Sequence, residues 1–186
     1  LSPIELERVY QACDQLDYPF GPLYKILLLT GQRLNEVAGM SWTEFDVDNA
    51  IWTIPSERAK NKSSHLVHLS KPVLKELNAL FEFSSSELVF TTTGSTPVSG
   101  FSKSKRKLDH LSDVSNWRLH DLRRSFATVT TETLGFEPTV VDRILNHVSG
   151  SVQGIAAVYQ RGEYLKKRKE VLEGWANYLE SLGQYG

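Results

Sequence analysis

The hydrophobic pattern of this chain changes period along its length, and this change constrains the fold more than any other feature. Up to about residue 40, apolar residues recur at the three- and four-residue spacing of buried helix faces. Residues 45–69 instead hold short β-type runs separated by polar turns, and the helical spacing returns from residue 72. The sequence therefore predicts a mainly α fold with a small three-stranded antiparallel sheet, in a single domain over residues 1–186.

The individual elements follow from this pattern and from the residues that flank each segment. Ser2, Pro3 and Glu5 suit the N-cap, first and third positions of a helix, so the first helix is expected to begin at Pro3. We expect helices at about residues 3–16, 23–31, 33–40, 72–83, 100–113, 120–134, 138–147, 154–160 and 163–182. We expect strands at residues 45–48, 51–55 and 65–69, and a further short strand at residues 88–90.

Composition narrows the class of protein. With 40% hydrophobic and 23% charged residues, the chain has the balance of a soluble globular domain. Its apolar runs fall short of the roughly 18 residues that span a membrane, and the opening "LSPIELERVY" lacks the pattern of a signal peptide. Cys13 is the only cysteine, which excludes an intrachain disulfide and a cysteine-based metal cluster. These features fit a cytoplasmic location.

The charge of the whole chain argues mildly against a nucleic-acid partner, because the formal net charge is −1. Two local clusters are nevertheless basic, "KSKRK" at residues 103–107 and "KKRK" at residues 166–169. Lys103, Lys105 and Arg106 in the first cluster are candidate DNA contacts, and a solvated helix face explains that cluster equally well. Acidic residues flank the second cluster, which favours a solvated face.

Two segments carry paired charged side chains at helical spacing. In "LHDLRRS", His120 and Arg123 are three residues apart, which places both donors on one helix face and indicates an anion site, with Arg124 on the next flank. Arg33 and Glu36 have the same spacing, at the start of an expected helix, where free backbone N–H groups also attract anions. The simplest interpretation of the second pair is an exposed ion pair, which stabilises a fold only slightly.

The expected β-hairpin contains further candidates that are weak when taken singly. Lys60 and Lys62 lie in the polar loop between two strands, where solvated lysines are common. His65 and His68 lie three residues apart on one expected strand, so their side chains should point to opposite faces of the sheet. They are therefore not expected to share a metal ion, and no metal site is predicted.

Taken in order along the chain, these segments resemble the catalytic domain of the tyrosine recombinases, or phage integrases. The segments "LLLTGQRLNEVAGMSWTEFD", "LHDLRRSFAT" and "LNHVSGSVQGIAAVYQR" are similar to the first, second and third sequence boxes of that family. "AKNKSSHLVHLS" resembles the hairpin box, and counting back from its end selects Lys60 over Lys62. The closing "EYLKKRKEVLEGWANYL" is similar to prophage and genomic-island integrases. The resemblance spans nearly the whole chain and implies these catalytic residues: Arg33, Glu36, Lys60, His120, Arg123, His147 and Tyr159.

The sequence departs from the family pattern at three places, none of which removes a catalytic group. His68 stands where the family commonly has proline, and Val148 stands where a small polar residue is common. The stretch between His147 and Tyr159 is longer than in the bacterial chromosome-dimer resolvases. The resemblance therefore leaves the resting position of Tyr159 open.

The resemblance implies that the bound anion is a DNA phosphodiester and that the activity is site-specific DNA recombination. Arg33 and Arg123 would clamp the non-bridging oxygens through paired N–H groups, and His120 and His147 would add donors. Fixed donors aimed at the charge that develops in the transition state are usually the largest catalytic contribution.

The remaining implied roles concern covalent chemistry and proton transfer. Tyr159 would attack phosphorus and form a 3′-phosphotyrosyl link, with His120 as the base that accepts its proton. Lys60 would protonate the leaving 5′-oxygen, and Glu36 would orient the neighbouring arginine and histidine side chains. This chemistry calls for no metal and no cofactor.

The resemblance also implies partners. We expect double-stranded DNA attachment sites, a homotetramer on DNA for the full-length protein, and a monomer for this segment alone. We expect the N-terminal DNA-binding domains that family members carry to be absent from this chain. The helix at residues 163–182 either packs on its own domain or is exchanged with the next subunit, with Gly162 as the hinge.

Three alternatives to a recombinase remain open at the level of sequence. A type IB topoisomerase uses similar chemistry to relax DNA. A protein of the same fold can bind DNA without cleaving it. A helical regulator without enzymatic activity would make these charged residues coincidental.

Overall fold

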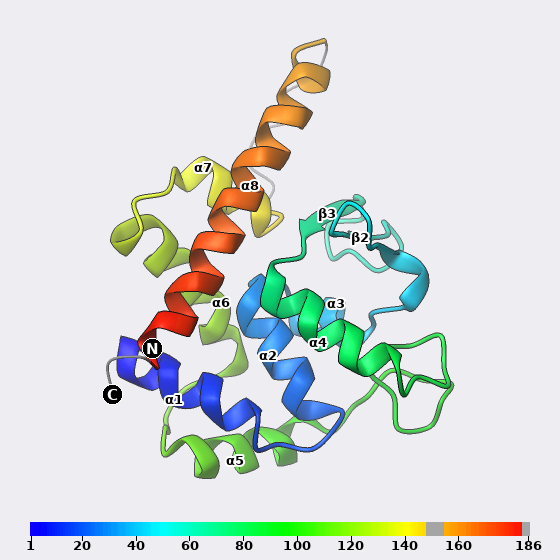
Figure 1. Ribbon diagram of the computed structural model, residues 1–186, viewed down its shortest axis with the longest axis vertical. Helices are drawn as coiled ribbons and strands as arrows, with labels where there is room; N and C mark the ends of the chain where they lie inside the picture. The colour runs from blue at the N-terminus through cyan, green and yellow to red at the C-terminus, as the bar shows by residue number, and fades with distance from the viewer. Residues whose placement is uncertain (148–154, 184–186) are drawn as a thin grey trace.

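The structure is a computed structural model that describes residues 1–147 and 155–183, with side chains described for residues 1–147 and 164–183. The α-helices of the described residues are α1 (Pro3–Cys13), α2 (Phe20–Thr30), α3 (Leu34–Ala38), α4 (Lys71–Phe81), α5 (Phe101–Ser112), α6 (Leu119–Thr128), α7 (Pro138–Ile144) and α8 (Ile155–Leu182) (Figure 1). A 3-10 turn, η1 (Trp42–Glu44), precedes the strands, and a π-turn, η2 (Val129–Thr133), extends α6. The strands are β1 (Phe45–Asp46), β2 (Ile51–Ile54) and β3 (His65–His68).

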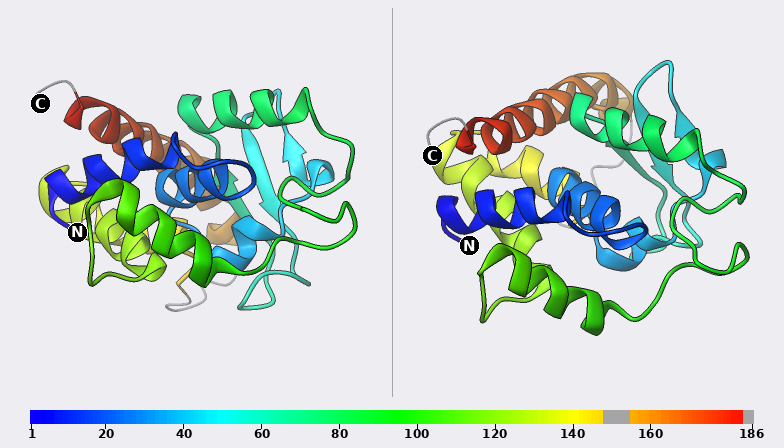
Figure 2. Two further views of the ribbon diagram at one scale, coloured as in Figure 1. Left: turned by 90° about the horizontal axis from the view of Figure 1, so that it is seen from below. Right: turned by 60° about the horizontal axis from the view of Figure 1, so that its bottom comes forward.

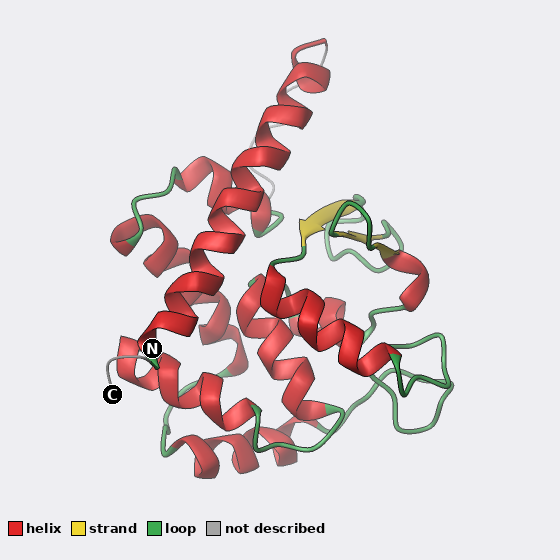
Figure 3. Ribbon diagram, viewed as in Figure 1, coloured by secondary structure: helices red, strands yellow, loops and turns green. Residues whose placement is uncertain are grey.

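The three strands form one antiparallel sheet in the order β1-β2-β3 beside a helical body, which confirms the predicted fold class (Figure 3). Trp52 in β2 pairs with Phe45 in β1 and with Val67 in β3. Trp52 and Val67 are buried, so the sheet is attached to the helices through its apolar face. Residues 55–64 connect β2 to β3 as a long loop.

The first helix begins where its flanking residues predict. The hydroxyl of Ser2 accepts the backbone N–H of Glu5 at 3.3 Å, and the Glu5 carboxylate accepts the backbone N–H of Ser2 at 2.7 Å. Together these bonds satisfy two N–H groups that a helix start otherwise leaves unpaired.

Residues 88–90 do not form the predicted strand. Leu88 makes only an isolated bridge to Ser41, and the Tyr18 hydroxyl donates to the carbonyl of Val89 at 3.1 Å. The N–H of Val89 donates to the carbonyl of Met40, and the N–H of Trp42 donates to the carbonyl of Glu87, each at 2.9 Å. The segment thus pairs with residues 40–42 over a single bridge, which is too short to form a strand.

The last helix is one element where two were predicted, because α8 continues through Gly162. An isolated glycine costs a helix only about 1 kcal/mol relative to alanine, and most of the residues that follow are strong helix formers. The prediction of a break between residues 160 and 163 is therefore wrong.

Helix α8 packs on its own domain in this structure. It contacts α1, α2, α7 and β3, and Figure 2 shows the course of the helix along the helical body from two directions. The indole N–H of Trp175 donates to the carbonyl of Leu28 at 2.9 Å, and its ring meets Phe126 edge-on at a centroid distance of 5.6 Å. The buried residues among the described side chains of α8 are Val171, Leu172, Trp175, Ala176 and Leu179. Among the described residues, no helix is long and apolar enough to cross a membrane.

Candidate active site

The candidate site is built on the turn that joins α2 to α3. Gly31 ends α2 with a left-handed φ of 63°, and a Cβ atom at this position would lie 2.9 Å from Cγ of Phe126. Glycine is the residue that tolerates both the backbone angle and the close ring. The chain then turns into α3, whose N-cap is Arg33.

Arg123 brings α6 to this turn. Its side chain is buried, with Nη1 donating to the carbonyl of Gly31 at 2.8 Å and Nη2 donating to the carbonyl of Leu145. Burial lowers the pKa of Arg123 to about 10, and the nearby positive charge of Arg33 is the second cause. The guanidinium therefore remains a cation at neutral pH. A guanidinium has five N–H groups, so Arg123 keeps donors for an anion after making these two bonds.

Arg33 and Glu36 form a partly buried pair, so the interpretation as an exposed ion pair is wrong. Nη1 of Arg33 lies 3.2 Å from Oε1 of Glu36, whose side chain is only 3% exposed. Nη2 of Arg33 donates to the carbonyl of Asn146 at 3.4 Å. Because the Glu36 carboxylate is shielded from water, its electrostatic attraction to the Arg33 guanidinium is stronger than that of a solvated carboxylate.

Lys60 is connected to the same carboxylate through its backbone. Its N–H donates to Oε1 of Glu36 at 3.3 Å, while its side chain is exposed in the β2–β3 loop. Lys62, two residues later, is exposed and has a left-handed φ of 55°. The structure thus joins the Lys60 segment to Arg33 through Glu36.

The two predicted histidines lie at helix ends. His120 is exposed in the first turn of α6, and its pKa is lowered by partial burial and then by the charges of Arg123 and Arg124. A lowered pKa keeps the imidazole neutral at pH 7, as a base requires. His147 follows α7, and its Nδ1 lies 2.9 Å from Oδ1 of Asp142.

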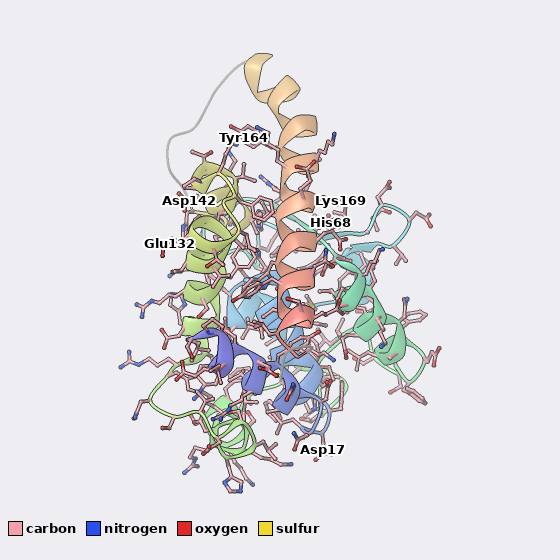
Figure 4. The ribbon with its side chains drawn as sticks, turned by 60° about the vertical axis from the view of Figure 1, so that its left-hand side comes forward. Asp17, His68, Glu132, Asp142, Tyr164 and Lys169 are labelled. Carbon is pink, nitrogen blue, oxygen red and sulfur yellow. The ribbon has the colours of Figure 1, made fainter. Side chains whose placement is uncertain are left out.

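Tyr159 belongs to α8, but its side chain lies outside the described residues. Tyr164, one turn and a residue later, is described. Its ring packs under the guanidinium of Arg143 at 4.0 Å, and Figure 4 shows it near the α7 end of the domain, not far from Asp142. Tyr164 is therefore engaged in packing α8 against α7.

The end of α7 collects side chains from several elements. The carbonyl of Ile144 accepts hydrogen bonds from Nε2 of His65 and Nε2 of Gln32, each at 2.9 Å. The carbonyl of Leu145 accepts a hydrogen bond from Arg123, and the carbonyl of Asn146 accepts one from Arg33. A helix leaves its last carbonyls without internal partners, so these donors hold α7 in place.

Sequence reasoning considered His65 only as a metal ligand and missed this contact. The period-two alternation of His65 with the buried Val67 and Leu69 is the signal that places it on the inner face. His68 pairs instead with Glu173 of α8 at 3.0 Å, so the two histidines serve different contacts.

His65 gives a prediction about stability and pH. Burial lowers its pKa to about 4, and because a carbonyl only accepts, the neutral ring carries its proton on Nε2. The unfolded histidine titrates near its ordinary value of 6.5. The free energy of unfolding that depends on a neutral His65 is therefore fully present above pH 6.5 and is lost as the pH falls toward 4. This difference in pKa corresponds to about 3 kcal/mol at most.

Urea unfolding at pH 7, 6, 5 and 4.5 measures this contribution when the protein is compared with His65→Gln. The difference in unfolding free energy between the two proteins should shrink as the pH falls. Parallel curves for the two proteins would contradict the assignment.

The basic clusters are only partly available to a ligand. On α5, Lys103 and Arg106 are exposed, whereas Lys105 pairs with Asp109 and lies over the ring of Trp117 at 3.8 Å. In the second cluster, Arg168 donates to the carbonyl of Leu66 and turns toward the sheet.

A pocket of about 500 Å³ lies away from these residues. It is lined by Tyr18, the end of α4 and the loop at residues 84–94, and it includes none of the predicted catalytic residues.

Comparisons with known proteins place the chain among integrases. The model of the phage integrase family matches residues 1–161. The prophage integrase IntZ of Escherichia coli (strain K12) is 27% identical over 159 residues, which cover 85% of this chain and 39% of that protein. The integrase of Shigella phage Sf6 is 26% identical over 159 residues, covering 84% of this chain and 40% of that protein. The chain thus spans about two fifths of the length of these relatives.

Solved structures share the fold. The XerA recombinase superposes with a TM-score of 0.67 at 20% identity, over 90% of this chain and 64% of that chain. The catalytic core of lambda integrase superposes with a TM-score of 0.60 at 18% identity, over 81% of this chain and 92% of that chain. The fold is therefore that of the catalytic domain of tyrosine recombinases, as the sequence boxes predict.

Proposed function

Because this chain belongs to the phage integrase family, we propose that it cuts and rejoins double-stranded DNA at specific sites through a 3′-phosphotyrosyl intermediate. The observation that carries the proposal is the buried guanidinium of Arg123, fixed by two carbonyls beside Arg33 and Glu36. Two fixed cations with spare N–H groups suit a phosphodiester whose charge grows during attack.

The proposed covalent step exchanges one phosphate ester for another. The phenolic oxygen of Tyr159 attacks phosphorus, the bond from phosphorus to the 5′-oxygen breaks, and a tyrosyl ester at the 3′-phosphate forms. Arg33, Arg123 and His147 stabilise the non-bridging oxygens. Because the new link keeps the energy of the old one, the 5′-hydroxyl of another strand reverses the step and completes strand exchange.

Two proton transfers accompany this step. A tyrosine phenol is protonated at neutral pH, so His120, held neutral by its lowered pKa, accepts the proton of Tyr159. Lys60 donates a proton to the leaving 5′-oxygen. Glu36 positions both sides of the site, because its carboxylate bonds the guanidinium of Arg33 and the backbone of Lys60.

The proposed partners are DNA attachment sites and further copies of the protein. Structures with this fold include the XerH recombinase bound to its difH substrate and a lambda integrase dimer bound to a COC′ core site. These neighbours support DNA as the ligand and assembly on DNA. We propose a homotetramer on paired sites and a cytoplasmic location.

A pool of duplexes tests the proposal. Each duplex has a randomised core and a nick close by, so that cleavage releases a short fragment and traps the covalent complex. The proposed function predicts a protein–DNA band that survives SDS and disappears after protease treatment. A protein that binds DNA without cleaving it gives no such band. A topoisomerase gives the band and relaxes a supercoiled plasmid, but does not exchange strands between two sites.

The proposed role of Lys60 as proton donor to the leaving 5′-oxygen gives a specific prediction. A substrate with sulfur in place of the bridging 5′-oxygen has a leaving group that needs no proton. Lys60→Ala should slow cleavage of ordinary DNA by about 10²-fold or more and recover most of that loss on the sulfur substrate. Single-turnover cleavage on both substrates measures the recovery.

The exposed Lys62 is the matched control for this experiment. Lys62→Ala should cleave both substrates at nearly the rate of the unmodified protein. If Lys60→Ala is equally slow on both substrates, the acid is another residue.

A further inference from the structure

Two asparagines join the β2–β3 loop to the end of α7. The amide nitrogen of Asn61 donates to Oδ1 of Asn146 at 2.6 Å, and the amide nitrogen of Asn146 donates to Oδ1 of Asn61 at 3.1 Å. The two residues are 85 positions apart in sequence, and both side chains are half-buried. An amide has one donor and one acceptor side, so this pair of bonds uses both sides of each group.

The positions of these residues connect two parts of the proposed site. Asn61 directly follows Lys60, and Asn146 directly precedes His147. The pair therefore lies between the segment that supplies the acid and the segment that supplies the second histidine.

The backbone around Asn146 is shaped for this contact. Asn146 has a left-handed φ of 51°, which asparagine tolerates better than most residues, and its N–H donates to the carbonyl of Arg143 at 3.2 Å. Its carbonyl accepts Nη2 of Arg33 at 3.4 Å. Asn146 thus contacts Arg33 through its backbone and the β2–β3 loop through its side chain.

The centre of the loop is a tight turn, in which the N–H of Lys62 donates to the carbonyl of the buried Ala59 at 2.9 Å. Lys60 is held through its N–H to Glu36 at 3.3 Å, while residues 62–64 are exposed. Oδ1 of Asn61 also accepts the N–H of Ser63 at 3.3 Å, so this side chain shapes the loop as well as anchoring it. Removing the amide at position 61 leaves the segment after Lys60 without its link to α7.

We propose that Asn61 and Asn146 form an amide latch that positions Lys60 for proton donation to the leaving 5′-oxygen. The latch rests on the proposed function, because it acts through the acid assigned there. Asn61 and Asn146 are positioning residues, since neither donates the proton. A displacement of about 1 Å in a catalytic group costs a reaction up to about 10²-fold, so a loose loop should slow cleavage measurably.

Three variants test the latch on ordinary and sulfur-substituted DNA. Asn61→Ala removes one amide, Asn146→Gly removes the other while tolerating the left-handed backbone, and the third protein carries both changes. Each single variant should cleave ordinary DNA about 10- to 100-fold more slowly and should recover on the sulfur substrate. Because the two amides form one contact, the double variant should be no slower than the slower single variant.

Asn49→Ala is the matched control, because Asn49 lies in the other turn of the same sheet and bonds Asp46 at 2.8 Å. It should cleave both substrates at the unmodified rate. Melting temperatures identify any variant that fails to fold, and Asn61→Ala, at a half-buried position that is not among the residues with positive φ, carries the test if Asn146→Gly unfolds.

The outcomes separate the latch from the function on which it rests. An unmodified protein that forms no covalent complex contradicts the proposed function and the latch together. A protein that cleaves normally, with Lys60→Ala recovered by sulfur and Asn61→Ala not recovered, contradicts the latch alone. Additive losses in the double variant also contradict it.

Discussion

Arg123→Lys is expected to slow DNA cleavage by about 10²- to 10³-fold, although it keeps the positive charge. The guanidinium of Arg123 bonds the carbonyls of Gly31 and Leu145 and still has N–H groups for phosphate oxygens. A lysine ammonium has three donors on one atom, so it cannot span both carbonyls and also offer a planar pair to the phosphate. Single-turnover cleavage of a trapped duplex measures the loss.

Arg124→Ala is the control for this prediction. Arg124 is the next residue on α6, its side chain is 72% exposed, and it forms a surface pair with Asp121 at 3.0 Å. Such a pair contributes little, so cleavage should fall by less than about threefold. Equal losses at Arg123 and Arg124 would contradict the assignment of Arg123 to the phosphate.

Tyr159→Phe is expected to abolish the covalent protein–DNA complex and to leave DNA binding nearly unchanged. The substitution removes only the phenolic oxygen, which is the atom proposed to attack phosphorus. Gel electrophoresis in SDS measures the complex, and a mobility shift without SDS measures binding.

Tyr164→Phe is the matched control on the same helix. The ring of Tyr164 packs under Arg143 at 4.0 Å, and phenylalanine keeps that ring, so the complex should form at the normal level. Loss of the complex in Tyr164→Phe, with a normal level in Tyr159→Phe, would exchange the two roles.

The fold could be predicted from sequence wherever one local signal dominates. The capping residues Ser2 and Glu5 locate the start of α1, and the change to period two locates the sheet. The prediction failed at residues 88–90, where pairing with residues 40–42 is limited to one bridge and the distant hydroxyl of Tyr18 bonds the carbonyl of Val89. It failed again at Gly162, because a glycine weakens a helix but does not end it when helix formers follow.

The order of residues along the sequence identified the candidate site residues. It did not predict which contacts their side chains make. The spacing of Arg33 and Glu36 gives no sign that the carboxylate is buried, because burial depends on how the sheet and α3 pack together. The contact of His65 with Ile144 spans 79 positions, beyond the reach of any local pattern. The paired asparagines escape sequence reasoning for the same reason.

The central claim is that a tyrosine of α8 becomes covalently linked to DNA during recombination. Mapping the site of this link tests the claim most directly. The trapped complex is digested with nuclease and trypsin, and the peptide that keeps a nucleotide is sequenced by mass spectrometry. The account predicts the remnant on Tyr159, joined through a 3′-phosphate with a free 5′-hydroxyl on the other fragment. A remnant on any other residue, or a link through a 5′-phosphate, would contradict it.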